Sequence, residues 1–292
     1  MVGMKSRQIE LITRLSRAAL LAALPAHRAT LLIAFWVLSV AGCCSKGPLV
    51  AAHCPGSHRV LCPIRQREEV DHTWDQWAKD HLQSGDIVFG MGDARACMGL
   101  FRFSRVSTRM AASRYSHTGL ISCEDGEVYV YDMAPEGARR KRFSQYLVED
   151  NVMNLAVKRL SPEKRHLAEA AVKYCQDVYE RQPNFDRQFV MGPEKLYCTE
   201  MVVLAYRSAG IDLCEPIRID EFPNYDKFPI TTFIGRLVPP FTPETQVFVP
   251  GNEQIGIWSS PDLDVVYEEC HFEHNQPEPT VQQVADRSRQ IF

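Results

Sequence analysis

The stretch that decides the fold is RYSHTGLISCEDGEVYVYD, residues 114–132. It holds two runs rich in β-branched and aromatic residues, 117–122 and 127–132, separated by a polar segment with an Asp-Gly pair. Because Asp-Gly is a strong signal for a tight hairpin turn, the stretch predicts two antiparallel strands. His117 begins the first strand and Asp132 ends the second, so a tight hairpin can make them neighbours across the pair.

Further strands and helices are predicted on both sides of this hairpin from the spacing of apolar residues. Strands are expected at 85–90 and 154–160, and helices at 95–110, from 161 onward, and from Cys198 or Thr199 to Gly210. Ser161, Pro162 and Glu163 are typical of a helix start. The order of elements predicts an α+β fold, with a small and mainly antiparallel sheet packed with helices.

A thiol at a predicted helix start is the most reactive feature of the sequence. Cys198 lies in LYCTEMVVLAY, residues 196–206, where unpaired N–H groups and the helix dipole lower a thiol pKa and can hold an oxyanion. An imidazole near the thiol, such as that of His117, would complete a nucleophile and base pair. Asp132 is the candidate that orients the imidazole. The three residues therefore predict a cysteine nucleophile, its base and an orienting acid.

Four segments together resemble a known family, and they are 83–89, 114–121, 128–133 and 196–206. They are similar to the YiiX/YebB-like family of circularly permuted NlpC-type papain-like cysteine hydrolases. Unpermuted relatives place the cysteine first, whereas this family has the order histidine, polar residue, cysteine, as in His117, Asp132 and Cys198. The resemblance implies a permuted papain-like fold with the nucleophile at a helix N-terminus, and amide hydrolysis through a thioester.

The orienting acid departs from the family pattern. Family members usually carry glutamate where Asp132 stands, so we expect the shorter side chain to reach the imidazole of His117 less directly or through water. Glu136 is the nearest substitute and lies in a turn-like segment. A weaker similarity at WSSPDL, residues 258–263, implies a Ser-Pro element ahead of a helix.

The oxyanion site departs from the family pattern as well. A tyrosine common in the family before the nucleophile is replaced by Phe185, which has no hydroxyl to donate. The resemblance then leaves backbone N–H groups around Cys198 as the oxyanion donors, with Tyr197 or Tyr115 assisting. Glu200 is expected to stabilise the helix N-terminus electrostatically, with recognition of a substrate amine as the alternative.

Three other groups of polar residues have simpler interpretations. Asp86 is expected to accept hydrogen bonds from turn amides at the entry to a strand. The basic run 139–142 is expected on a solvated loop, with contact to anionic wall polymer or lipid headgroups as the alternative. No metal or cofactor is expected, since no common zinc spacing is matched by the cluster of His53, Cys54, His58 and Cys62. A Cys54–Cys62 disulfide or no role is favoured there.

The N-terminus is typical of a targeting segment. Five basic residues precede the uncharged run ATLLIAFWVLSVA at 29–41, which as a helix would extend only about 20 Å, too short for a bilayer of about 30 Å. This pattern favours a secretory signal over an uncleaved anchor, which remains the alternative. Val40-Ala41-Gly42-Cys43 resembles a bacterial lipobox, which implies lipidation of Cys43. The predicted organisation is a signal at 1–42, a lipid-anchored linker at 43–73 and a hydrolase domain at 74–292.

Composition limits the classes of partner. The chain is 45% hydrophobic and 24% charged, which is a globular balance, and its net charge is -3. Positions 1–42 hold five of the 33 basic residues and one of the 36 acidic residues, so the remainder carries a net charge of -7. Nucleic-acid binding is therefore disfavoured, because it requires a basic surface.

The expected function is that of a cysteine hydrolase in the cell envelope, outside the cytoplasm and anchored to a bacterial membrane through lipid on Cys43. The favoured substrate bond is an amide in a cell-wall peptide, as the family resemblance implies. A lipid acyltransferase or phospholipase-type acyl hydrolase is the first alternative. A binding lipoprotein that keeps the fold with little turnover is the second.

Overall fold

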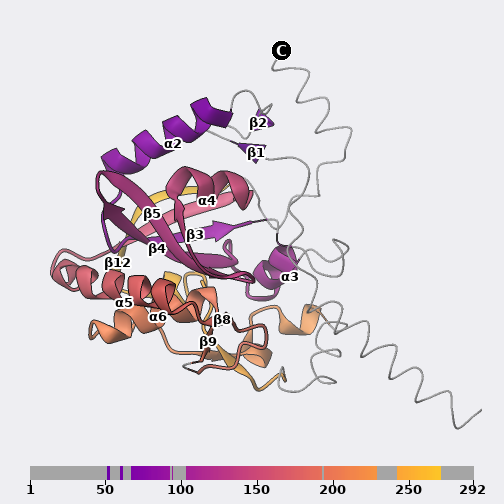
Figure 1. The fold of residues 1–292 in the computed structure, drawn as a ribbon. Helices are drawn as coiled ribbons and strands as arrows, with labels where there is room; N and C mark the ends of the chain where they lie inside the picture. Colours follow the sequence, from indigo (N-terminus) through magenta and orange to yellow (C-terminus); the bar gives the residue numbers. More distant parts are fainter. Residues whose placement is uncertain are drawn as a thin grey trace, which may run out of the picture. The chain divides into compact units, whose positions relative to one another are not determined.

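The structure is a computed structural model of the 292-residue chain, and it describes residues 51–52, 60–61, 67–92, 94, 103–192, 194–228 and 242–270, with side chains from 71 onward. At its centre is a six-stranded sheet in the order β12-β7-β3-β4-β5-β6 (Figure 1). All its neighbouring strands are antiparallel, and they are β3 (Ile87–Met91), β4 (His117–Glu124), β5 (Glu127–Ala134), β6 (Gly137–Arg142), β7 (Asn154–Leu160) and β12 (Leu263–Cys270). The predicted α+β fold with a mainly antiparallel sheet is confirmed.

Helices cover both faces of this sheet. Figure 1 shows α2 and α4 on one face and α5 and α6 on the other. The helices are α2 (Arg67–His81), α3 (Phe103–Met110), α4 (Phe143–Glu149), α5 (Ala168–Arg181) and α6 (Cys198–Ser208). Short 3-10 turns lie at Arg165–Leu167, Ile219–Glu221, Tyr225–Lys227 and Ile257–Ser259. Two-residue strands are β1 (Ala51–Ala52), β2 (Val60–Leu61), β8 (Asn184–Phe185), β9 (Lys195–Leu196), β10 (Ile217–Arg218) and β11 (Gln246–Val247).

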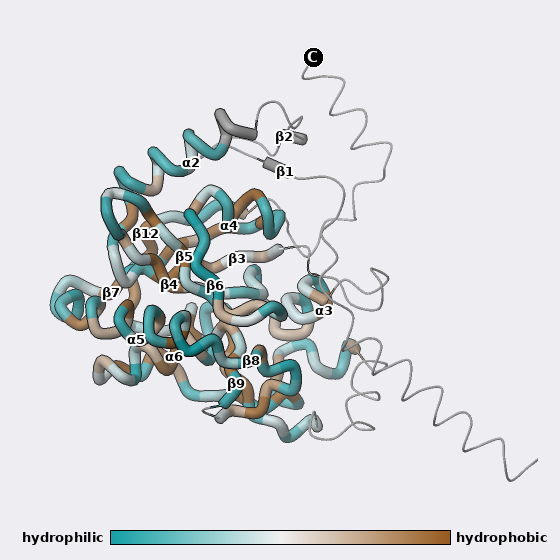
Figure 2. The backbone as a smooth tube through the Cα atoms, viewed as in Figure 1, coloured by the Kyte–Doolittle hydropathy of each residue, from teal (hydrophilic) through white to brown (hydrophobic). Residues whose placement is uncertain are grey.

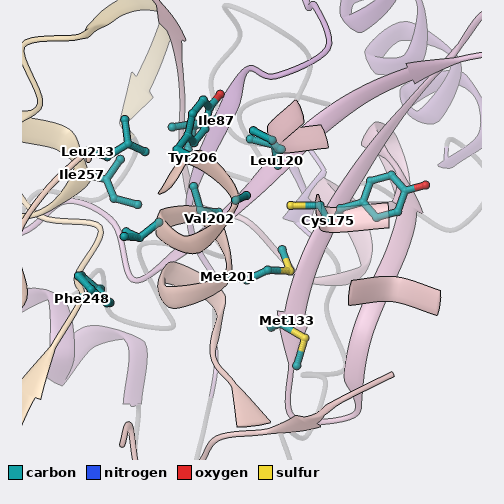
Figure 3. Close-up of a cluster of buried hydrophobic side chains, with 14 of the residues drawn as sticks. Ile87, Leu120, Met133, Cys175, Met201, Val202, Tyr206, Leu213, Phe248 and Ile257 are labelled. Atoms are coloured by element: carbon teal, nitrogen blue, oxygen red, sulfur yellow. The ribbon is translucent and has the colours of Figure 1, made fainter. Parts of the chain in front are cut away.

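The sheet separates two hydrophobic cores because alternate side chains of a strand point to opposite faces. In β4, Leu120 packs into the core beneath α5 and α6, whereas Ile121 packs into the core beneath α4. Figure 3 shows the first core, in which Met201 and Val202 of α6 lie near strand residues. Figure 2 shows α2 mainly hydrophilic along its length, with hydrophobic segments at α4 and the central strands.

The predicted hairpin is present, with the turn that its sequence favours. Leu120 pairs with Tyr131, and the register continues to Glu124 opposite Glu127. Asp125 and Gly126 between the strands both have positive φ, at 51° and 77°. A two-residue turn with positive φ at both positions matches the right-handed twist of the strands, which explains why Asp-Gly sets this register.

Three predicted details are wrong. Residues 139–142 do not form a loop but strand β6, because Pro135 and Glu136 turn the chain back along β5 and Gly137 adopts φ 115°. Ser161 does not start a helix: a turn with Lys164 N–H bonded to the Ser161 carbonyl precedes the 3-10 turn, and α5 begins only at Ala168. The segment after WSSPDL is strand β12 rather than a helix, paired along β7.

The N-terminal predictions lie mostly outside the described residues. Cys43 and the apolar run 29–41 are among them, as are His53, Cys54, His58 and Cys62. Helix α2 begins at Arg67 and therefore crosses the boundary expected between 73 and 74. Within the described ranges, no helix is both long and apolar enough to span a bilayer.

Candidate active site

The hairpin brings His117 and Asp132 into direct contact. His117 is the first residue of β4, and Asp132 lies near the end of β5 on the same face of the sheet. Their side chains meet at 2.6 Å between Nε2 and Oδ2. Because a buried carboxylate is an acceptor only, Nε2 carries the proton of this hydrogen bond. The expectation that the shorter aspartate would reach the imidazole less directly, or through water, is therefore wrong.

Two glycines make room for this contact. A Cβ added at Gly119 would lie 2.7 Å from the Val130 side chain and 3.2 Å from the Cβ of Asp132. Gly90 pairs with His117 across β3 and β4, and a Cβ there would lie 2.6 Å from the hydroxyl of Tyr146. β4 and the neighbouring β3 therefore carry no side chain at Gly119 and Gly90, where Asp132 and Tyr146 approach His117.

Helix α6 places the thiol of Cys198 against the imidazole. Cys198 is the first residue of α6, after Tyr197 in an extended N-cap conformation, and it is 8% exposed. Its sulfur lies 3.8 Å from the hydroxyl oxygen of Thr199, and it lies close enough to His117 for the two groups to shift each other's pKa. Since Nε2 of His117 is engaged by Asp132, the nitrogen left for the sulfur is Nδ1. The structure thus brings the three predicted residues together at the start of α6.

The charged forms of Cys198, His117 and Asp132 stabilise one another. Burial alone raises the pKa of Cys198, but the charge of His117 and its hydrogen bond hold that pKa below its ordinary value. Burial likewise lowers the pKa of His117, yet the Cys198 thiolate and the Asp132 carboxylate together raise it to about 10. Each of the two groups therefore favours the charged form of the other, which is the pairing that activates a cysteine nucleophile.

Asp132 is kept ionised by an arginine. It is 1% exposed, and burial raises the pKa of its carboxyl, but the charge of Arg139 and hydrogen bonds from His117 and Arg139 bring that pKa well below its usual range. Arg139 lies directly opposite Asp132 in the pairing of β5 and β6. Its Nε donates to Oδ1 at 2.9 Å, and its Nη2 donates to Oδ2.

Glu136, the second candidate for orienting the imidazole, lies elsewhere. Its side chain is 56% exposed and accepts a hydrogen bond from Arg139 at 3.0 Å. The basic run that holds Arg139 is paired rather than solvated: Arg140 binds Glu124, and Lys141 binds Asp150. The interpretation of this run as a solvated loop is therefore wrong in its contacts as well as in its backbone.

The two tyrosines expected at the oxyanion site are engaged with other groups. The hydroxyl of Tyr115 donates to Glu268 of β12 at 2.7 Å, and its ring packs against Trp258. The hydroxyl of Tyr197 accepts the backbone N–H of Phe248 at 2.6 Å. Neither of these contacts leads to Cys198. Backbone N–H groups remain at the start of α6, where the first residues of a helix have no intrahelical acceptor.

Glu200 lies in the first turn of α6 with a buried side chain. It is 1% exposed, and its Oε1 accepts the backbone N–H of Gly192 at 3.2 Å. Burial and the nearby Asp186 raise the pKa of Glu200 to about 7 despite this bond. Its place in the first turn of α6 is the one expected of an acid that stabilises a helix start electrostatically. Burial leaves little surface for a substrate amine.

Sequence reasoning missed two residues of this site and placed one correctly outside it. Arg139 was missed because GARRKR lacks apolar alternation and because its contact with Asp132 depends on the register of β6 against β5. Tyr146 of α4 was missed because no motif marks it, and its ring lies nearly parallel to that of His117 with centroids 6.2 Å apart. Asp86 accepts the turn amide of Gln83 at 2.8 Å, as predicted, and also pairs with Arg159.

The described part of the chain contains no group of three or more His, Cys, Asp or Glu side chains placed to hold a metal ion. The free thiols described there are Cys123, Cys175, Cys198, Cys214 and Cys270. Burial raises the pKa of Cys175 and brings that of Cys214 to about 12. Among these thiols, Cys198 has the environment that favours a thiolate.

Comparisons with known proteins agree with this geometry. Residues 81–222 match the family described as permuted papain-like amidase enzymes, the YaeF/YiiX or C92 family. A crystal structure described as metalloprotein yiiX from Escherichia coli O157:H7 is similar, with a TM-score of 0.51 and 22% identity, over 64% of this chain and 98% of that one. At this identity the likeness shows the fold. None of the curated proteins matches the chain significantly.

Proposed function

Because residues 81–222 belong to the family of permuted papain-like amidases, we propose that this chain is a cysteine amidase whose nucleophile is Cys198. The observation that carries the proposal is the placement of the Cys198 sulfur beside His117, whose Nε2 is hydrogen-bonded to Asp132. Family membership supports amide hydrolysis as the reaction. The residues and their roles are our assignment.

In the proposed reaction the Cys198 thiolate attacks the amide carbon, forming a C–S bond and a tetrahedral oxyanion. Backbone N–H groups at the start of α6 would hold that oxyanion. His117 then donates its Nδ1 proton to the leaving amine as the C–N bond breaks, leaving a thioester. Water loses a proton to His117, attacks the thioester and releases the acid and the thiolate. Asp132 stays ionised throughout and orients the ring.

We propose a cell-wall peptide as the substrate, with the enzyme in the cell envelope. What supports this location is the sequence pattern of a signal at 1–42 followed by a lipobox, in which Cys43 would carry the lipid. Lipid on the N-terminal cysteine would hold the domain at a bacterial membrane, next to wall polymer. The net charge of -7 after removal of the signal is unsuited to nucleic acid.

An acyl-lipid substrate is the second candidate, and exposed apolar side chains favour it. Phe103, Val190 and Met191 are 40%, 46% and 38% exposed. Phe189 stacks against Phe103 on one side and packs against Tyr197, the neighbour of Cys198 in the chain, on the other. These rings and aliphatic groups are of the kind that contact acyl chains, which would suit a lipid acyltransferase or phospholipase-type hydrolase.

The test is hydrolysis of a panel of wall peptides and acyl lipids by the purified protein. Cys198→Ala should abolish the activity found on either class, whereas Cys214→Ser should retain it, because Cys214 is a half-buried thiol that the reaction does not use. Cleavage of wall peptides with no cleavage of lipids would support the first candidate. Activity that survives Cys198→Ala would overturn the assignment, and no turnover on either class would favour a binding lipoprotein.

A further inference from the structure

We propose that Arg139 is a positioning residue of this site. Its guanidinium holds the Asp132 carboxylate ionised and in one orientation, so that Asp132 accepts the Nε2–H of His117 and the ring presents Nδ1 to Cys198. The proposal rests on the proposed function, since it assigns Arg139 a part in activating the same nucleophile. Arg139 itself acts through Asp132 and touches neither the thiol nor the carbon it attacks.

The contacts of Arg139 hold its guanidinium in one position. Two of its nitrogens, Nε and Nη2, donate to the two oxygens of Asp132. Its Nη1 and Nη2 also donate to Asp150, at 3.2 Å and 2.7 Å, and Nη1 donates to Glu136. The guanidinium is thus held between Asp132 of β5 and Asp150 at the end of α4. Its side chain is 12% exposed, so little water competes for these bonds.

Titratable groups face this arrangement from each element packed around Asp132. They are His117 of β4, Arg139 of β6, Tyr146 of α4, Asp150 at the C-cap of α4, Glu136 of the turn, and Cys198 of α6 beyond His117. Among them, Arg139 carries the charge that does not titrate at any accessible pH. Lys141 pairs with Asp150 and Glu149.

Without Arg139, Asp132 would be a buried carboxylate with His117 as its remaining charged partner. A proton shared by these two groups would then rest more on Asp132, because an isolated buried carboxylate is costly. A neutral imidazole would no longer stabilise the Cys198 thiolate. The expected consequence is that the thiolate forms at higher pH. The planar fork of arginine also fixes the carboxylate plane, which a lysine ammonium cannot do.

The test measures the rate at which iodoacetamide alkylates Cys198 between pH 4.5 and 9. Tryptic cleavage after Lys195 and Arg207 gives peptide 196–207, which contains Cys198 as its one cysteine, so mass spectrometry reports this thiol separately from the others. The variants are Arg139→Gln and Arg139→Lys. Arg140→Gln is the matched control, because Arg140 neighbours Arg139 on β6 but binds Glu124 and lies over the ring of Tyr129.

We expect Arg139→Gln to move the acidic limb of the alkylation profile upward by about one pH unit, which is about a tenfold loss of rate at pH values on that limb. Arg139→Lys should move it less, and Arg140→Gln should leave it in place. An unchanged or downward-shifted limb in Arg139→Gln would overturn the proposal. If Arg139→Gln does not fold, Asp150→Asn decides instead, since it removes the second anchor of Arg139 without touching Asp132: it should shift the limb in the same direction, and no shift overturns the proposal.

The same experiment separates failure of this proposal from failure of the proposed function. If Cys198 is not an activated nucleophile, the rising limb of the wild-type peptide 196–207 will lie at alkaline pH, and the peptide will react no faster than the one that contains Cys214. If Cys198 is activated but Arg139 plays no part, the wild type will show the limb and Arg139→Gln will keep it.

Discussion

At the scale of single residues, the site depends on which groups carry charge. The imidazole of His117 contacts an anionic oxygen of Asp132 on one side and the sulfur of Cys198 on the other. Each negative partner favours the imidazolium, and the imidazolium in turn favours the thiolate. The ionisation of Cys198 is therefore controlled mainly by one neighbouring ring.

This coupling predicts the effect of His117→Gln. Without the imidazolium, burial raises the pKa of Cys198, so the thiolate fraction near pH 6.5 should fall at least tenfold. The measurement is the alkylation rate of peptide 196–207 at that pH. His166→Gln, at an exposed histidine in the 3-10 turn before α5, is the control and should leave the rate unchanged. Equal rates in wild type and His117→Gln would show that the imidazole does not activate the thiol.

Glu200 predicts a pH dependence of stability. Its pKa in the folded protein is raised to about 7 from 4.5, so the folded state binds more protons than the unfolded state between these values. Its contribution to stability is therefore fully present below about pH 4.5 and is lost as pH rises through about 7. Glu200→Gln removes this pH-dependent loss of stability. The substitution should therefore change the free energy of unfolding by about 1–3 kcal/mol more favourably at pH 8 than at pH 5.

Urea unfolding of wild type and Glu200→Gln at the two pH values measures this difference. The glutamine keeps an oxygen for the Gly192 N–H, so this hydrogen bond need not be lost. A difference between the two proteins that does not change with pH would contradict a raised pKa at Glu200.

At the scale of elements, the hairpin depends on close approach at its glycines. Gly119 faces Val130 and Asp132 across β4 and β5, and a Cβ there would also lie 2.9 Å from the carbonyl oxygen of Tyr131. A backbone oxygen cannot move aside as the end of a flexible side chain can. The strands would have to separate where Asp132 reaches His117.

Gly119→Ala should therefore lower the free energy of unfolding by about 1–3 kcal/mol, the usual cost of overpacking. It should also slow alkylation of Cys198 at acidic pH, because Asp132 is displaced. Gly192→Ala is the control, since the nearest atom to a Cβ there is 3.9 Å away. Thermal melts and the alkylation assay give the two readouts, and wild-type values in both would show that the strands tolerate a side chain at 119.

How far each element could be predicted from sequence follows from its local signals. The hairpin 117–132 was predictable because alternation and the Asp-Gly turn agree. Strand β6 was not, because its sequence GARRKR is mostly charged and its arginine and lysine side chains are neutralised by acids from other elements. Ser161 and Pro162 fit a helix start but also fit the turn that they form.

The residues of the site, like the elements, could be predicted from sequence only where local signals mark them. Cys198, His117 and Asp132 were predictable because helix start, strand start and hairpin are local features. The contact of Arg139 with Asp132 needs the register of a third strand, which the sequence does not mark. The hydroxyls of Tyr115 and Tyr197 are engaged by Glu268 and by the backbone of Phe248, both far along the chain.

At the scale of the whole molecule, the candidate site combines side chains from elements on both faces of the sheet. His117 and Tyr146 belong to the face covered by α4, and α6 packs on the opposite face. Cys198 can reach His117 because Cys198 is the first residue of α6 and His117 is the first residue of β4. The core beneath α2 and α4 thus supports the imidazole, and the core beneath α5 and α6 supports the thiol.

Helix α2 should therefore be part of the folded domain from its first half onward. Trp74 is 1% exposed and packs edge-on against Phe143 of α4. Trp74→Ala should lower the free energy of unfolding by about 3–5 kcal/mol, the typical cost of removing a buried tryptophan. Gln76→Ala, on the exposed side of α2, should change it by less than about 0.5 kcal/mol. Similar urea midpoints for the two variants would place α2 outside the cooperative unit.

Formation of a thioester on Cys198 under the control of His117 can be measured by acyl transfer. The protein is incubated with activated acyl probes, one peptidyl and one lipid-like, then digested and mapped by mass spectrometry. We expect an acyl mass on peptide 196–207 that hydroxylamine removes, that is absent in Cys198→Ala and that is strongly reduced in His117→Gln. An acyl group on a different cysteine, or equal labelling in His117→Gln, would show that Cys198 and His117 are not the reactive pair.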